Sequence, residues 1–300
     1  CYSGTFDGSY YTISNIKLMP NTGASDWRGL FGYIYGGTVT KLNIQAEDFG
    51  PRTEGKKLFY SGLLAGENSG GDISLCSATI KYINNVEDVS LLVYRNTGNI
   101  KICYAFLNGT NRSSGNGTSG LVSYNMGKIT NCYFKNASSA FTYTDNYAII
   151  AKNDSGNGGI ITNCYYYSSD PSTKTYLDNG ENIVAKGSSA LAQNSPELIW
   201  LLNNGQNSQT NNTGPWRYRN NVCPSLDPTR QKVIKNADGT YTLETPHIHM
   251  DNGEPIEFTE ITDLSEINDS SLTSKWTNYF CLKDDIKLDK SWTVPTSCNN

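Results

Sequence analysis

The stretch Gly120–Cys132, Gly-Leu-Val-Ser-Tyr-Asn-Met-Gly-Lys-Ile-Thr-Asn-Cys, is one copy of a unit that recurs along the first half of the chain. The copies begin with a small residue, at Gly29, Gly62, Ser90, Gly120 and Ala148. An aliphatic residue follows within each copy: Leu30, Leu63, Leu91, Leu121 and Ile149. Eight to twelve residues later comes a branched aliphatic residue: Val39, Ile73, Ile100, Ile129 and Ile161. Three residues further on stand Leu42, Cys76, Cys103, Cys132 and Cys164.

A short unit that recurs in a fixed order predicts stacked turns rather than a layered globular domain. The apolar positions are Leu or β-branched residues, the breaks are Asn and Gly, and no copy shows helical spacing. One turn cannot bury its own apolar side chains. Stacked turns can, because each side chain then lies ~4.8 Å from its counterpart. We therefore expect an all-β fold, a parallel β-solenoid.

Asparagine recurs just before the Gly-bearing turn of the unit, at Asn68, Asn96, Asn125 and Asn153. Asparagine tolerates the left-handed backbone conformation that tight turns require. Asparagine can therefore be abundant simply because it serves the turns, which is the alternative to its use in the glycosylation sequons of an extracellular protein.

Composition excludes several classes of partner. The net charge is −4 and only 17% of the residues are charged, so no basic surface for nucleic acid is indicated. No apolar run approaches the ~18 residues that insertion into a membrane requires. No signal peptide precedes Cys1, which favours a mature form or an excised piece.

Cysteines and glycosylation sequons favour an extracellular protein. The eight cysteines lack paired C-x-x-C spacing, so a zinc site is not indicated. Candidate N-glycosylation sites are Asn108, Asn111, Asn116, Asn136, Asn153, Asn211 and Asn268.

The segment Gly4–Gly8, Gly-Thr-Phe-Asp-Gly, is followed by Gly29-Leu30-Phe31-Gly32 and then by the recurring unit. This order resembles the GLUG-type repeats of microbial surface proteins, over residues 1 to about 168. The resemblance implies a right-handed parallel β-helix of the kind found in adhesins and surface-anchored proteins. It says little about function, because such repeats are a scaffold.

We divide the chain into three parts. Residues 1–168 form the β-helix, residues 169–230 form a capping segment with one helix, and residues 231–300 contain a hairpin and a partial next module. Ser195 is the expected N-cap of the helix, and Asn204-Gly205 its end. Trp216 and the segment Pro224–Leu226 resemble the closing element of GLUG-type modules, which implies a cap on an open end of the stack. A hairpin over 232–245 turns at Asp238-Gly239.

The two ends of the chain look like parts of one module. Short elements at 261–267, 280–286 and 291–295 resemble the lead-in that, in the family, runs into a segment like Tyr2–Gly8. The chain could close on itself, form one period of a longer polypeptide, or complete the first turn of a neighbouring copy head to tail. A disulfide between Cys1 and Cys298 could lock this seam. A fourth interpretation is a fragment with arbitrary boundaries.

The recurring cysteines Cys76, Cys103, Cys132 and Cys164 predict a ladder with two open interpretations. Stacked turns bring neighbouring Cα atoms within disulfide range, so Cys76–Cys103 and Cys132–Cys164 could be bonded. Leu42 at the same place in an earlier copy favours buried thiols instead. Tyrosines follow three ladder cysteines, at Tyr104, Tyr133 and Tyr165, and should form an outward column.

Catalysis is not indicated. No histidine lies in the repeats to activate a thiol. His247 and His249 lie two residues apart, so they share one face of an expected strand. They are weak candidates for metal ligands. The carboxylates Glu47, Asp48, Asp284, Asp285 and Asp289 do not recur from turn to turn. We expect no cofactor and no catalytic residue.

The sequence therefore predicts a non-enzymatic extracellular structural or adhesive module that assembles head to tail into a filament, sheath or cell-surface array. Its expected partners are copies of itself, with surface glycans as a second kind of partner. The alternative is a carbohydrate-binding or polysaccharide-cleaving β-helix.

Overall fold

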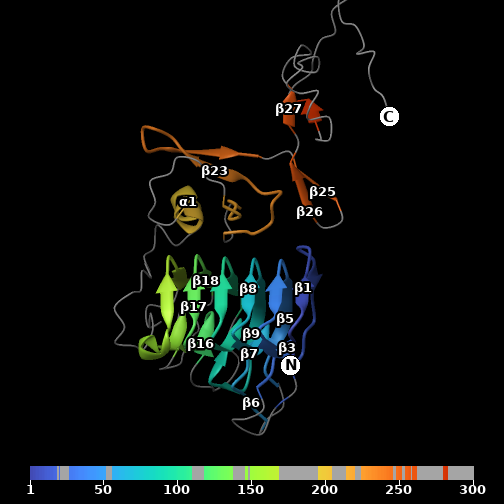
Figure 1. Ribbon diagram of the computed structural model, residues 1–300, viewed down its shortest axis with the longest axis vertical. Helices are drawn as coiled ribbons and strands as arrows, with labels where there is room; N and C mark the ends of the chain where they lie inside the picture. The colour runs from blue at the N-terminus through green and yellow to red at the C-terminus, as the bar shows by residue number, and fades with distance from the viewer. Residues whose placement is uncertain are drawn as a thin grey trace, which may run out of the picture.

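The structure is a computed structural model, shown in Figure 1. It describes residues 1–18, 20, 27–51, 56–109, 118–137, 146–147, 149–168, 195–204, 214–219, 224–245, 248–251, 254–257, 259–261 and 280–282. Residues 1–168 contain a parallel β-solenoid of about 5 turns, so the predicted fold class is confirmed.

Three parallel sheets form the sides of the solenoid. The first contains, in order, β20 (Ile150–Asn153), β16 (Val122–Asn125), β12 (Val93–Asn96), β7 (Ala65–Ser69) and β3 (Phe31–Tyr35). The second contains β1 (Thr5–Asp7), β4 (Thr38–Thr40), β8 (Asp72–Ser74), β13 (Asn99–Lys101), β17 (Lys128–Thr130) and β21 (Ile160–Thr162). The third contains β2 (Thr12–Ile13), β5 (Asn43–Phe49), β9 (Ser77–Ile83), β14 (Tyr104–Leu107), β18 (Tyr133–Asn136) and β22 (Tyr165–Ser168).

Short strands complete the turns. β6 (Leu58–Phe59) pairs with β10 (Val86–Glu87), and β15 (Thr118–Ser119) lies between β11 (Val89–Ser90) and β19 (Asn146–Tyr147). A 3-10 helix, Ser155–Asn157, is part of the last turn. Figure 1 shows the strands of successive turns side by side along the stack.

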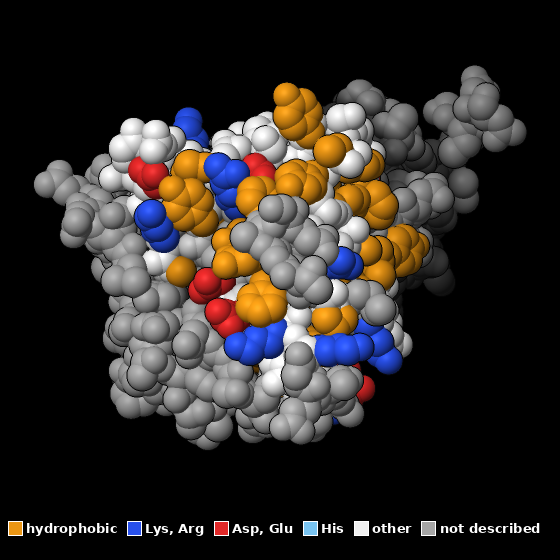
Figure 2. Space-filling view, turned by 90° about the horizontal axis from the view of Figure 1, so that it is seen from below, with side chains coloured by type: hydrophobic (Ala, Val, Ile, Leu, Met, Phe, Trp, Pro, Cys, Tyr) orange, Lys and Arg blue, Asp and Glu red, His pale blue; other side chains and the backbone are white. Residues whose placement is uncertain are grey.

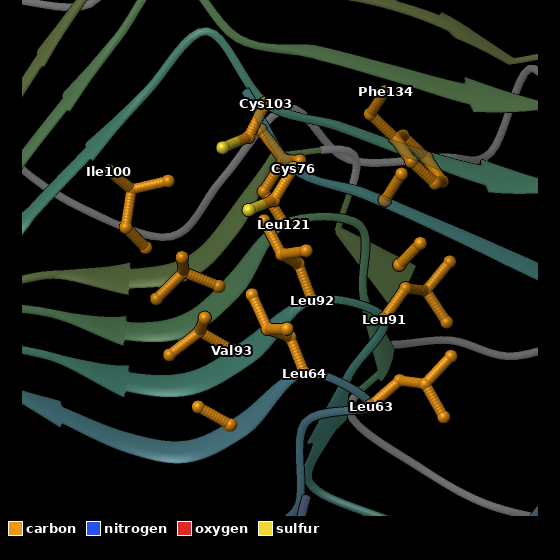
Figure 3. Close-up of a cluster of buried hydrophobic side chains, with 14 of the residues drawn as sticks. Leu63, Leu64, Cys76, Leu91, Leu92, Val93, Ile100, Cys103, Leu121 and Phe134 are labelled. Carbon is orange, nitrogen blue, oxygen red and sulfur yellow. The ribbon is translucent and has the colours of Figure 1, made fainter. Parts of the chain in front are cut away.

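The interior consists of columns of identical or similar side chains. Ile73, Ile100 and Ile129 are partners in adjacent strands of the second sheet and are fully buried. Burial of such a side chain contributes about 1.5–3 kcal/mol. Figure 3 shows Leu64, Leu92 and Leu121 in another column.

The pairing register corrects two positions of the repeat. Val93 pairs with Val122 and with Ala65, which places Leu92 and Leu64 opposite Leu121. In the repeat predicted from the sequence, Leu63 and Leu91 occupy the places opposite Leu121 instead. These two leucines form a neighbouring column, also seen in Figure 3.

The corner between the second and third sheets has the same conformation in successive turns. The residue at this corner has a φ between 51° and 56°, and the residues concerned are Lys41, Leu75, Ile102, Asn131 and Asn163. A left-handed φ is uncommon for leucine and is an outlier for β-branched isoleucine. The next residue in each turn, Leu42 or a ladder cysteine, is buried inside the solenoid.

The recurring asparagines form a ladder of buried amides. Asn68 donates from Nδ2 to Oδ1 of Asn96 at 2.8 Å, Asn96 donates to Asn125 at 2.8 Å, and Asn125 donates to Asn153 at 2.7 Å. Their φ angles are not left-handed. These asparagines therefore serve the turns through their side chains, as in the bonds between Asn96 and Gly98, and not through a left-handed backbone, which Asn131 and Asn163 adopt at the corner.

Helix α1 (Pro196–Asn204) begins as predicted, because Ser195 Oγ accepts a hydrogen bond from Leu198 N at 3.1 Å. The hairpin of β23 (Lys232–Lys235) and β24 (Tyr241–Glu244) is also confirmed, with Gly239 at φ 87° in its turn. We call residues 195–204, 214–219 and 224–245 together the lateral segment.

The lateral segment packs along the side of the solenoid. The indole of Trp216 donates to the carbonyl oxygen of Asn131 at 3.2 Å, and Asn163 Nδ2 donates to the carbonyl oxygen of Leu201 at 2.9 Å. Figure 1 shows α1 and β23 beside the corner ends of the strands rather than beyond the last turn. This position differs from our expectation that Trp216 and residues 224–226 close an open end.

Four further strands follow the lateral segment. β25 (Ile248–Asp251) and β26 (Glu254–Glu257) are antiparallel, and β27 (Thr259–Ile261) pairs in parallel with β28 (Phe280–Leu282). A strand was expected at 280–286. Its described part is β28, which pairs with β27 of the same chain. Residues 283–300 lie outside the described residues, so the seam itself, including Cys298, is not described.

Candidate functional site

The four ladder cysteines are stacked free thiols. Cys76, Cys103, Cys132 and Cys164 are fully buried, and none of the four forms a disulfide. The backbone N–H of Cys103 donates to Sγ of Cys132 at 3.4 Å. Figure 3 shows the sulfur atoms of Cys76 and Cys103 on the same side of the column. The sequence left open whether these cysteines form disulfides or buried thiols, and the structure contains buried thiols.

Each thiol donates to the carbonyl oxygen two residues before it, for example Cys132 to Thr130 at 3.2 Å. Burial raises the pKa of the Cys103 and Cys164 thiols well above the usual value. Burial also opposes ionisation of Cys132, but hydrogen bonding at its sulfur, including the bond donated by the backbone N–H of Cys103, outweighs burial and lowers the pKa of Cys132. Because reagents cannot reach these sulfur atoms, the ladder acts as packing material in the folded chain.

The predicted tyrosine column exists but is covered. Tyr104, Tyr133 and Tyr165 are partners in adjacent strands, and Tyr133 and Tyr165 are buried beneath the lateral segment. The ring of Trp216 lies 6.1 Å from that of Tyr104. Tyr133 and Tyr165 therefore pack against their own chain, whereas the half-buried Tyr104 also lines the pocket described below.

The two ends of the stack carry strands with one partner each among the described residues. At one end these strands are β1 and β2, and at the other they are β20, β21 and β22. All pairings between turns are parallel, so each end presents backbone N–H and C=O groups in the pattern that the other end could accept. The ends are thus geometrically complementary.

Side-chain exposure also differs at these ends. Leu30 is 36% exposed, whereas Leu64, its counterpart one turn further, is fully buried. Ile160 of β21 is 39% exposed and occupies the position held by Lys128 one turn earlier.

An aromatic surface covers part of the first sheet. We define it as Trp27, Tyr33, Tyr60, Tyr94 and Arg95. The rings of Trp27 and Tyr33 are stacked at 5.4 Å, and the guanidinium of Arg95 lies 5.4 Å from the Trp27 ring. Figure 2 shows the face that carries β6, where hydrophobic side chains lie beside basic and acidic ones. Aromatic residues mixed with Arg are enriched at protein interfaces.

Two ionisable groups of this region are shifted by burial. Glu67 forms an ion pair with Arg95 at 3.5 Å, yet burial raises the pKa of Glu67 more than Arg95 lowers it. Burial, with a smaller effect of Asp88, raises the pKa of Tyr94 to about 12.

A pocket of about 410 Å³ lies between the third sheet and the lateral segment. We call it the corner pocket. Its floor is formed by outward side chains of β5 and β9, including Gln45 and Thr79. Arg219 and Asp227 line it from the lateral segment, and Tyr11 from the first turn of the solenoid. Local sequence patterns do not reveal this pocket, because Tyr11 and Arg219, which both line it, are more than 200 residues apart in the chain.

The predicted glycosylation sites do not share one environment. Asn108 is exposed after β14. Asn136 and Asn153 are buried, and Asn153 belongs to the amide ladder, so neither can carry a sugar in the folded chain. The remaining candidates, Asn111, Asn116, Asn211 and Asn268, lie outside the described residues.

Other predicted residues are dispersed. His249 lies in β25, whereas His247 lies outside the described residues. Glu47 forms an exposed ion pair with Lys81 at 3.5 Å, and Asp48 accepts from Asn84 Nδ2 at 2.8 Å. Cys1 is an exposed free thiol. Asp284, Asp285 and Asp289 lie outside the described residues.

Within the described part of the chain, no three His, Cys, Asp or Glu side chains are grouped so that they could hold a metal ion. The helices described there are also too short or too polar to cross a membrane. Comparison with known proteins found no matching family model, no matching curated protein and no matching solved structure.

Proposed function

We propose that the chain is a non-enzymatic extracellular structural or adhesive module that stacks end to end with copies of itself into a filament, sheath or cell-surface array. The observation that carries this proposal is the complementarity of the two ends of the solenoid. In the second and third sheets the outermost strands lie at opposite ends of the stack, and among the described residues each has only one partner.

In such a stack, β21 of one copy pairs with β1 of the next, and β22 pairs with β2. Phe6 of β1 then lies over Ile161 of β21, in the column that already contains Val39. The contact leaves Ile160 at its outer rim, because Ile160 points away from the core as Lys128 does. Because its two surfaces differ, it is heterologous and extends indefinitely unless the rotation closes a ring.

The extracellular and adhesive parts of the proposal are supported by composition and by the resemblance to GLUG-type repeats. The aromatic surface offers a second place for a partner to bind. The ladder cysteines are buried thiols and take no part in the contact, so backbone pairing and side-chain stacking carry it.

Negative-stain electron microscopy and sedimentation velocity of the full chain test this proposal. We expect linear polymers whose length grows with protein concentration. Phe6→Lys should disrupt them, because its charge would be buried over Ile161 in the contact. The fold should tolerate this change, since Phe6 is only half-buried at the end of the stack. Ile160→Lys is the matched control and should still polymerise, because Ile160 points away from the core in the column of the exposed Lys128.

Two outcomes would reject the proposal. One is a wild-type chain that sediments as a monomer at every concentration up to solubility. The other is a polymer that Phe6→Lys and Ile160→Lys affect equally, because the interior column at the ends of the stack would then take no part in its contact.

A further inference from the structure

We propose that the corner pocket binds a neutral saccharide of one or two sugar units. This inference goes beyond self-assembly and does not depend on it, because the pocket lies on the side of the solenoid. Its volume of about 410 Å³ is within the range of ~300–1,000 Å³ that is usual for small-molecule sites.

The first turn of the solenoid is altered at the pocket. Four residues connect Asp7 to Thr12, whereas two connect the paired positions Thr40 and Asn43 in the next turn. The longer connection contains Ser9 and Tyr10 in left-handed conformations, with φ of 47° and 61°. Two consecutive residues of this kind are uncommon, and strained backbone is concentrated at functional sites.

Hydrogen bonds hold this connection in place. Tyr10 N donates to the carbonyl oxygen of Lys41 at 2.7 Å, and Tyr11 N donates to that of Gly8 at 2.8 Å. As a result Tyr11 lines the pocket while 70% of it is exposed to solvent. An exposed tyrosine ring on a fixed backbone can stack on the C–H face of a sugar ring and lose little conformational entropy in doing so.

The floor of the pocket is polar and partly fixed. Asn43 Nδ2 donates to the carbonyl oxygen of Tyr10 at 2.7 Å, and Asn43 Oδ1 accepts from Ser77 Oγ at 2.6 Å. Gln45 and Thr79 are partners in adjacent strands beside this pair. Amide and hydroxyl groups both donate and accept hydrogen bonds, as a sugar hydroxyl does.

The charges around the pocket favour a neutral ligand over an anion. Arg219 lines the pocket together with Asp227. Asp227 also pairs with Arg230 at 3.0 Å, and Lys41, near the Tyr10 ring, pairs with Asp7 at 3.5 Å. A phosphate or sulfate group would meet a carboxylate as well as a cation here. Neutral hydroxyl groups can use Arg219 as donor and Asp227 as acceptor.

Ligand-observed NMR and calorimetry on the full chain test this inference. The probes are the disaccharides maltose, cellobiose, diacetylchitobiose and galactobiose, with inorganic phosphate as the anionic probe. We expect at least one saccharide to bind with a Kd near ~1 mM or below. Tyr11→Ala should weaken its binding about 3- to 10-fold, and Tyr11→Phe should restore it, because the ring and not the hydroxyl makes the stacking contact.

Gln45→Ala is a second variant, at an exposed position in the floor, and should also weaken binding. Tyr35→Ala removes an equally exposed tyrosine, 67% exposed, from the first sheet and should change nothing. Three results would overturn the inference: no saccharide bound at ~10 mM, unchanged binding in both Tyr11→Ala and Gln45→Ala, or binding of phosphate alone. The assay uses dilute protein and the Phe6→Lys variant in parallel, so neither the success nor the failure of self-assembly would affect its result.

Discussion

Trp216 donates its indole N–H to the carbonyl oxygen of Asn131 at 3.2 Å, although the two residues are 85 positions apart in the chain. Asn131 occupies the left-handed corner of its turn. The backbone around Trp216 is held in turn by Asn203, whose side chain accepts from Trp216 N and donates to Trp216 O. This relationship anchors the lateral segment on the solenoid.

Trp216→Ala should therefore release the lateral segment. Loss of a fully buried tryptophan costs about 3–5 kcal/mol, measured by urea unfolding. Trp216→Phe keeps most of the buried ring but loses the hydrogen bond, and should cost only about 1–2 kcal/mol. Equal free energies of unfolding for the wild type and both variants would show that the lateral segment is anchored elsewhere.

The amide ladder makes a graded prediction. Asn96 accepts from Asn68 and donates to Asn125, so Asn96→Ala leaves buried polar groups on both sides and should cost about 2–4 kcal/mol. Asn68 begins the ladder, opposite Ile34, and its Oδ1 has no partner among the described residues. Asn68→Ala should therefore cost about 1 kcal/mol less. If urea unfolding showed a larger loss of stability for Asn68→Ala than for Asn96→Ala, the result would contradict the ladder.

Thiol chemistry distinguishes the ladder from Cys1. Cys1 is exposed and should react readily with iodoacetamide at pH 8, whereas the four buried thiols should react ~100-fold more slowly, because the solenoid must open first. Peptide-resolved mass spectrometry after timed alkylation measures both. A non-reduced digest that contains a Cys76–Cys103 or Cys132–Cys164 linkage would contradict the buried-thiol arrangement.

Tyr165 should make stability depend on alkaline pH. Burial, with a smaller effect of Cys164, raises the pKa of Tyr165 from 10.0 to about 12. Between these values the folded chain keeps a proton that the unfolded chain loses, so the free energy of unfolding falls as pH rises from about 10 to about 12.

Tyr165→Phe should make this decline shallower than in the wild type. The comparison concerns the slope with pH, because Tyr165→Phe also loses the hydrogen bond to Asn163 Oδ1 at every pH. Parallel slopes for Tyr165→Phe and the wild type would contradict the raised pKa.

The repeat was readable from sequence because each turn uses similar residues at equivalent places. Ile73, Ile100 and Ile129 indicate their own column, and the cap at Ser195 indicates the start of α1. The one-residue error at Leu63 arose because Leu63-Leu64 and Leu91-Leu92 are doublets, and both members of each are buried. Only the strand register separates them.

The amide ladder and the corner pocket could not be predicted in the same way. The spacing of Asn68, Asn96 and Asn125 was visible, but asparagine in a turn and asparagine in a buried ladder give the same pattern. A signal did exist in the glycine that follows each amide. A Cβ on Gly98 would collide with the carbonyl oxygen of Gly71, which indicates close stacking at this point. The corner pocket depends on where the lateral segment docks, and local sequence does not encode that.

The lateral segment has a consequence for how this solenoid can vary. It packs against the corner residues Leu75 and Ile102, and its Leu201 carbonyl oxygen accepts a hydrogen bond from Asn163 in the last turn. It also lines the corner pocket together with Tyr11 of the first turn. A solenoid ordinarily gains or loses turns by duplication or deletion of a repeat. Here the lateral segment has a fixed length and spans the solenoid from its first turn to its last. An inserted repeat would therefore require a longer lateral segment, or one corner would be left uncovered.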